Sequence, residues 1–184
     1  FFLLFFLNYI LETYQKEYPF SKVFNAGIIL SVFSFVFPNL LFLLLLVVIS
    51  GINYSNLNWR NLIIACIGII NPYFFYFIYT IIVGEIFIFP EFETLKLINF
   101  PDINSLKTPK LIWIFATGII SLFSFIELSR WLYKKSIRSR KSFLIIFFYF
   151  AFCLLLILFG GLKSWYFLIT PLCVIIGNYF PYTK

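Results

Sequence analysis

Residues 61–83 read NLIIACIGIINPYFFYFIYTIIV, a run that contains no charged side chain. As an α-helix, with a rise of about 1.5 Å per residue, a run of this length crosses a bilayer core about 30 Å thick. Trp59 and Arg60 precede the run, and both residue types are common where a helix enters the membrane. We therefore expect residues 61–83 to form a transmembrane helix, bent where Pro72 removes a backbone hydrogen bond.

The composition of the whole chain favours the same class of protein. Hydrophobic residues make up 62% of the 184 residues and charged residues only 11%, and the mean hydropathy is +1.01. A soluble domain averages about 25% charged residues, because its surface must be solvated. We expect most of the surface to contact lipid. The 28 phenylalanines are interpreted as membrane composition, not as an aromatic ligand site.

The apolar runs, the prolines and the charges together predict an all-α fold, a polytopic transmembrane helical bundle that forms a single domain over residues 1–184. The expected spans are residues 24–37, 38–50, 61–83, 111–133, 143–162 and 165–180. Residues 24–50 admit two interpretations, because Pro38 interrupts a stretch without charges between Lys22 and Arg60. One is a hairpin of two short helices near the N-terminal part, and the other is a single kinked span.

Two further features concern the ends of the chain and its longest polar segment. The sequence contains no Met and opens inside the apolar run Phe1–Leu7, so we expect an internal fragment of a longer chain. Residues 84–109 contain Pro90, Pro101 and Pro109 together with several acids. That composition is unsuited to a span, and we expect a loop there.

The distribution of positive charges predicts the orientation in the membrane. Residues 134–141 read KKSIRSRK and carry five positive charges and no acid. Short loops rich in Lys and Arg stay in the cytoplasm. The loop 134–141 and the C-terminus are therefore expected in the cytoplasm and the loop 84–109 outside.

Glu127 is the one acid placed within a helical pattern near the membrane, and an ionisable residue in a span is a candidate functional group. Arg130 follows three residues later, at a spacing that brings two side chains together on a helix. We favour a structural intramembrane ion pair of Glu127 with Arg130. Cys66, Cys153 and Cys173 lie in apolar runs without the spacing of metal ligands. We expect no metal site and no cofactor, and the sequence identifies no catalytic residue.

Lys163 is the only charge between Lys141 and Lys184, and it follows Gly160-Gly161 in a tight turn before the last expected span. Two interpretations stay open. A lysine at this external position can contact the phosphate of a lipid as a point charge, or it can be a solvated turn residue.

Several short motifs carry a resemblance to a known family. They are Phe24-Asn25-Ala26-Gly27-Ile28, Phe37-Pro38-Asn39-Leu40-Leu41, Asn58-Trp59-Arg60-Asn61-Leu62-Ile63-Ile64-Ala65, Asn71-Pro72-Tyr73-Phe74, the basic run 134–141, and Thr170-Pro171-Leu172 with Asn178-Tyr179-Phe180. The chain resembles a domain-of-unknown-function family of polytopic bacterial inner-membrane proteins over nearly its whole length. The resemblance implies a membrane architecture, a location in the bacterial inner (cytoplasmic) membrane, and no particular activity.

A looser likeness is to glycosyltransferases of the GT-C fold, which use polyprenyl-phosphate sugars. Residues 25–65 resemble the small-residue helix, proline-bearing reversal, Leu-rich helix and Trp–Arg element of that fold. The likeness implies the hairpin for residues 24–50 and a lipid-phosphate contact at Lys163, before the helix with Pro171. The catalytic acid of that fold lies in the first external loop, which would precede residue 1.

The sequence thus leaves three functional hypotheses. The first is a multi-pass inner-membrane protein that works as a scaffold or partner subunit in cell-envelope biology. The second is a GT-C-like glycosyltransferase, and the third is a transporter, which would need more polar residues in facing spans. The expected partners are membrane lipid, a polyprenyl-phosphate lipid under the second hypothesis, and other membrane subunits. No nucleic-acid partner is expected.

Overall fold

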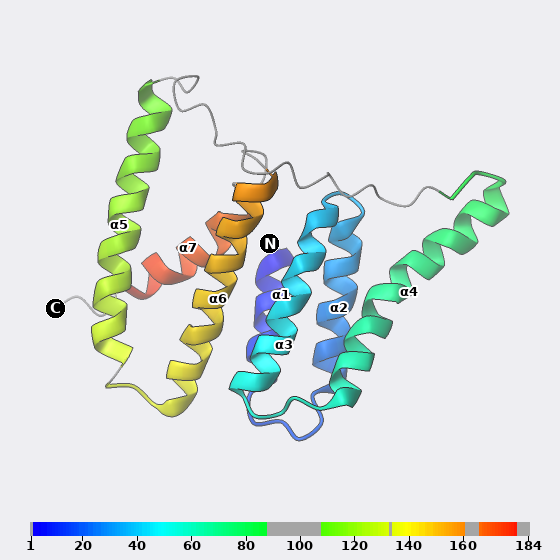
Figure 1. The fold of residues 1–184 in the computed structure, drawn as a ribbon, viewed down its shortest axis with the longest axis horizontal. Helices are drawn as coiled ribbons and strands as arrows, with labels where there is room; N and C mark the ends of the chain where they lie inside the picture. The colour runs from blue at the N-terminus through cyan, green and yellow to red at the C-terminus, as the bar shows by residue number, and fades with distance from the viewer. Residues whose placement is uncertain (1, 88–107, 133, 161–165, 180–184) are drawn as a thin grey trace. The chain divides into compact units, whose positions relative to one another are not determined.

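A computed structural model describes residues 2–87, 108–132, 134–160 and 166–179, and every regular element in these residues is a helix (Figure 1). The all-α prediction is confirmed for this part of the chain. The elements are α1 (Phe2–Leu11), α2 (Phe20–Ser34), the 3-10 helix η1 (Pro38–Leu43), α3 (Leu44–Asn53), α4 (Trp59–Val83), α5 (Thr108–Leu132), α6 (Ile137–Gly160) and α7 (Tyr166–Tyr179). They belong to two compact units, unit 1 (Phe1–Thr94) and unit 2 (Leu95–Lys184).

In unit 1 the chain reverses direction between α2 and α3. Phe37 is extended, with φ −134° and ψ 84°, and Pro38 opens η1. A proline disfavours the helical conformation in the residue before it and suits the first position of a helix, so the sequence Phe37-Pro38 ends one helix and begins another. Both η1 and α3 pack back against α2 (Figure 1). Residues 24–50 therefore form two helical arms, not one kinked helix.

Helices α2 and α4 approach each other closely where both carry small residues. A Cβ atom added to Gly27 would lie 2.7 Å from the carbonyl oxygen of Ala65, and one added to Gly68 would lie 2.6 Å from that of Phe24. A few positions later the Ser31 hydroxyl donates a hydrogen bond of 2.6 Å to the Ile69 carbonyl oxygen. Backbones come this close only where side chains are absent.

Unit 2 is built from α5, α6 and α7, and α7 packs against both other helices. Its described core includes Ile145, Tyr149 and Cys153 on α6 and Ile175 on α7. Pro171 lies inside α7 and is buried. Of the three cysteines, Cys66 and Cys173 are exposed on their helices, whereas Cys153 is buried.

The basic segment 134–141 contains a shorter loop than its charges predict. Helix α6 begins at Ile137, so Arg138, Arg140 and Lys141 lie in its first turns. The reason is Ser136, whose carbonyl oxygen accepts the first helical hydrogen bond, from Arg140 N at 3.1 Å. Its hydroxyl also lies 3.4 Å from Ser139 N, and Ser is a preferred residue at this capping position.

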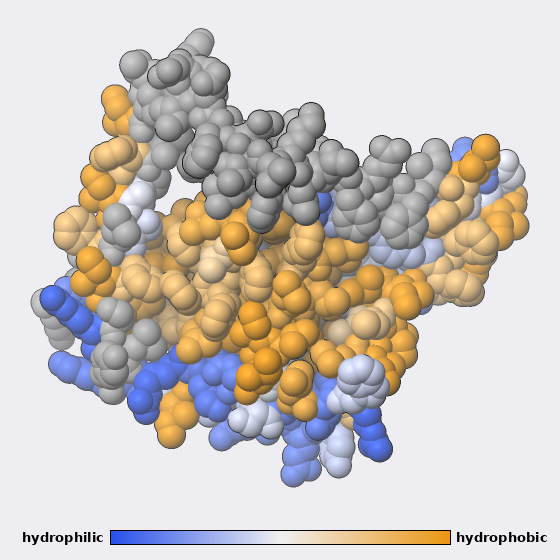
Figure 2. All heavy atoms as spheres, in the orientation of Figure 1, coloured by the Kyte–Doolittle hydropathy of each residue, from blue (hydrophilic) through white to orange (hydrophobic). Residues whose placement is uncertain are grey.

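Two helices in the described residues are long and apolar enough to cross a membrane, Trp59–Val83 and Ile137–Ile157. Most residues of both helices are not fully buried, since only 11% of the most apolar window of α4 and 28% of that of α6 is buried. In Figure 2, hydrophobic residues cover much of the visible surface of α4. The other apolar helices are shorter, among them Phe2–Leu11, Phe20–Ser34 and Pro38–Asn53.

Candidate functional site

The α1–α2 and α3–α4 connections lie at the same end of unit 1 (Figure 1), and both are rich in polar residues. Two asparagines connect these segments. The Asn56 side-chain amide donates to the Thr13 carbonyl oxygen at 2.9 Å, and the Asn61 amide donates to the Asn56 carbonyl oxygen, also at 2.9 Å. A chain of amides therefore joins the end of α1, the α3–α4 connection and the first turn of α4.

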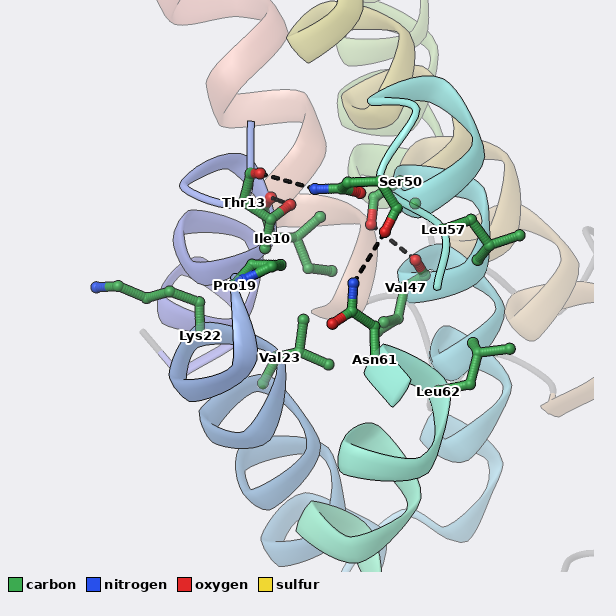
Figure 3. Close-up of a pocket in the computed structure, with 13 residues that line it drawn as sticks. Ile10, Thr13, Pro19, Lys22, Val23, Val47, Ser50, Leu57, Asn61 and Leu62 are labelled. Carbon is green, nitrogen blue, oxygen red and sulfur yellow. Dashed lines mark hydrogen bonds between the residues drawn. The ribbon is translucent and has the colours of Figure 1, made fainter. Parts of the chain in front are cut away.

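A small cavity of about 20 Å³ lies beside this chain of hydrogen bonds (Figure 3). All four α-helices of unit 1 or their connections contribute to its wall. Its polar lining comes from Thr13, Ser50, Asn56 and Asn61, and its apolar lining includes Ile10, Val23, Val47 and Leu62. The cavity thus lies where the helices of this unit converge.

Asn61 is the residue of this cavity whose polar groups are least satisfied. Its side chain is only 6% exposed. The amide nitrogen is hydrogen-bonded, but the amide oxygen Oδ1 is buried and has no hydrogen-bond partner in the described protein. Most buried polar atoms have a partner, because desolvating one without compensation costs free energy. An unsatisfied oxygen beside a cavity marks this position as a candidate binding site.

Lys22 contributes its side chain to the wall of the cavity, while its charge is engaged elsewhere. Its ammonium forms an ion pair with Glu12 and lies 5.2 Å from the centre of the Tyr9 ring. The Asn8 amide also donates to Glu12, at 2.8 Å. The hydrogen bonds from Lys22 and Asn8 lower the pKa of Glu12 below its ordinary value, and the hydrogen bond to Glu12 raises the pKa of Lys22.

The residues singled out from the sequence lie in unit 2. Arg130 Nη1 is 3.8 Å from Glu127 Oε1 on α5, and the two side chains are 75% and 51% exposed. That distance fits an ion pair but is too long for a hydrogen bond. The intramembrane position of the pair stays a prediction. Lys163 lies outside the described residues, so its contact with a lipid phosphate stays a prediction too.

Thr13, Asn56 and Asn61 are not among the site residues predicted from the sequence. Asn61 belongs to the Asn58–Ala65 motif, and Asn56 and Thr13 lie in polar connections that resemble ordinary loops. The usable signal was the density of asparagines in residues 53–61, which read NYSNLNWRN. Asparagines at a helix start often satisfy backbone groups, but their convergence on Thr13 depends on the tertiary fold.

The chain belongs to a family of unknown function (DUF6427), and the sequence model of that family matches residues 1–184. This finding confirms the resemblance to a domain-of-unknown-function family. No curated protein matches the chain, and no solved structure does either.

Proposed function

We propose that this member of the family is a multi-pass integral membrane protein that acts as a scaffold or partner subunit, holding other membrane components through the apolar sides of its helices. The observation that carries the proposal is the exposure of α4. Ile70, Phe75 and Ile82 on this helix are 61%, 64% and 78% exposed. An apolar helix inside a soluble protein would be mostly buried, whereas lipid and neighbouring membrane helices both accept such a surface.

The arrangement of unit 1 supports a multi-pass topology. The polar connections 12–19 and 54–58 lie at one end of the unit, and the reversal between α2 and α3 lies at the other. In Figure 2, hydrophilic residues lie where these connections of unit 1 are, and apolar residues cover the helices above them. Polar connections at the ends of apolar helices are the pattern of a protein that meets water only at its two faces.

Extraction of cell membranes tests the first part of the proposal. The chain is expected to stay in the membrane pellet after alkaline carbonate, which strips peripheral proteins, and to enter solution with a mild detergent. Release by carbonate alone would contradict integration in the bilayer.

In-cell photo-crosslinking tests the role as a scaffold. A photoreactive phenylalanine at Phe75 on α4 is expected to give a defined crosslink to another membrane protein. The same group at Tyr18, an exposed aromatic residue of the polar α1–α2 connection, is the matched control and should not give that product. Crosslinks from Phe75 to lipid alone would contradict a partner at this face.

A second candidate function is the GT-C-like transferase, and the reversal between α2 and α3 is the observation that favours it. One measurement, the consumption of a sugar donor, distinguishes a scaffold from a transferase. The full-length protein in detergent, supplied with a polyprenyl-phosphate sugar and an acceptor, should leave the donor unconsumed if it is a scaffold. Turnover of the donor that is lost in Lys163→Gln would favour the transferase.

A further inference from the structure

The orientation of the Asn61 amide is fixed by its neighbour. The carbonyl oxygen of Asn56 can only accept a hydrogen bond, so the atom of Asn61 that lies 2.9 Å from it must be the NH₂ nitrogen. The amide oxygen is then the atom left over. In Figure 3 this oxygen points away from the hydrogen bond, among the residues that line the cavity, and no described group donates to it.

The two hydroxyl groups in the lining present lone pairs as well. The Thr13 hydroxyl donates its proton to the Ile10 carbonyl oxygen at 2.7 Å, and the Ser50 hydroxyl donates to the Val47 carbonyl oxygen at 2.8 Å. Each hydroxyl has a single proton, so what remains on Thr13 and Ser50 is acceptor capacity. A group that satisfies Asn61 Oδ1 must therefore be a hydrogen-bond donor.

The Lys22 ammonium is a hydrogen-bond donor of the chain itself, but it is directed away from Asn61. Lys22 belongs to the lining, yet its ammonium points away from Asn61 in Figure 3. The ion pair with Glu12 and the contact with the Tyr9 ring account for that direction. Moving the ammonium to Asn61 would break both interactions.

The size of the cavity limits the donor. Its volume is about 20 Å³, and a site needs about 10–15 Å³ of such space to hold one water molecule. We propose that this cavity binds a single hydroxyl group, which donates a hydrogen bond to Asn61 Oδ1 and comes from water or from the headgroup of a lipid. This inference does not depend on the scaffold function.

A high-resolution structure of the whole protein tests the inference directly. The protein would be studied in a detergent that has no hydroxyl groups, once without lipid and once with added phosphatidylglycerol. We expect density at a hydrogen-bond distance of about 2.6–3.2 Å from Asn61 Oδ1. An isolated peak in both structures identifies water, and density continuous with the added lipid identifies a headgroup hydroxyl. An empty cavity, or the Lys22 ammonium or a leucine side chain in that place, would overturn the inference.

A pair of variants shows whether the amide oxygen holds the group. In Asn61→Leu the acceptor is lost, and the density should disappear. Asn58→Leu adds the same side chain three residues earlier, at an exposed position, and should retain it. Persistence of the density in Asn61→Leu would mean that other atoms bind the group, against the inference.

A second variant covers the case in which Asn61→Leu does not fold. Val23→Leu enlarges the apolar wall of the cavity and leaves the amide intact. If the cavity binds a hydroxyl, Val23→Leu should remove the density beside an unchanged Asn61 side chain. Density that remains at full strength in the Val23→Leu structure would contradict the assignment of the group to this cavity.

Discussion

Glu12 and Lys22 join the end of α1 to the start of α2 through an ion pair at the polar end of unit 1. Both side chains are partly exposed, at 38% and 28% respectively, so solvent screens the attraction between them. The pair still has a geometric consequence, because it holds the Lys22 ammonium away from the cavity that Asn61 lines.

The first prediction concerns the pH dependence of stability. The folded pKa of Glu12 is depressed below its ordinary value of 4.5, so its stabilisation is present above pH 4.5 and is lost as the pH falls through the folded pKa. The folded pKa of Lys22 is raised above 10.5, so its stabilisation is present below pH 10.5 and is lost as the pH rises through the folded pKa.

Glu12→Gln is therefore expected to lower the thermal unfolding midpoint modestly at pH 7 and to flatten its decline below pH 4.5. Unfolding followed by circular dichroism in detergent, from pH 3 upward, measures both effects. Glu17→Gln is the matched control, since Glu17 is exposed in the same connection and forms no ion pair in the part of the chain that the structure describes. A midpoint at pH 7 that falls equally in both variants would contradict a specific role for Glu12.

At the scale of elements, the contact between α2 and α4 holds unit 1 together. Gly27 and Gly68 face each other there, with Ala65 buried beside them. Because small residues remove the side chains that would separate the helices, the two backbones meet directly. The Ser31 hydroxyl adds a hydrogen bond across the same contact.

The second prediction is that Gly27→Ala destabilises the protein by about 1–3 kcal/mol, the usual cost of overpacking. The added Cβ would lie 2.7 Å from a backbone oxygen, so a helix must move to relieve the clash. Gly118→Ala is the control, because Gly118 on α5 has open space at the same atom and alanine favours a helix by up to about 1 kcal/mol. Equal unfolding midpoints for both variants in detergent would count against the close contact.

The helices were largely predictable from the sequence, because apolar runs without charges and the prolines carry that information locally. Residues 61–83 were predicted as a helix, and α4 has the bounds Trp59–Val83. The start of α6 was misjudged, since the charges of residues 134–141 suggested a loop while Ser136 supplies a helix cap. The amide chain through Thr13, Asn56 and Asn61 was missed, because it joins residues far apart in the sequence and depends on how the helices pack.

At the scale of the whole molecule, the lengths of the helices constrain how the chain would cross a bilayer in the proposed membrane topology. Helix α4 has 25 residues and α2 has 15. At about 1.5 Å per residue, α4 exceeds a core about 30 Å thick, and α2 alone falls short of it. Helices α2 and α4 begin at the same end of unit 1 (Figure 1). This holds however deeply the α2–α3 hairpin enters the membrane. Lys16 and Arg60 are therefore expected on the same side of the membrane.

The last prediction concerns the side of the membrane that each connection faces. Labelling of single cysteines with an impermeant thiol reagent measures it, in a background without Cys66, Cys153 and Cys173. The charges of residues 134–141 are costly to move across a bilayer. We therefore expect Ser139→Cys to react only after the cells are permeabilised and Ser105→Cys to react in intact cells. The reverse pattern would overturn the orientation.

Two further positions, Lys16 and Asn39, decide how deeply the hairpin inserts. Lys16→Cys is expected to behave like Ser139→Cys, since the polar end of unit 1 faces the cytoplasm in this topology. Asn39→Cys, beside the reversal at Pro38, should react from outside if both arms of the hairpin cross the bilayer. If Asn39→Cys stays unreactive on both sides while Lys16→Cys is cytoplasmic, the short helices form a re-entrant hairpin, and the expected spans 24–37 and 38–50 are wrong as crossings.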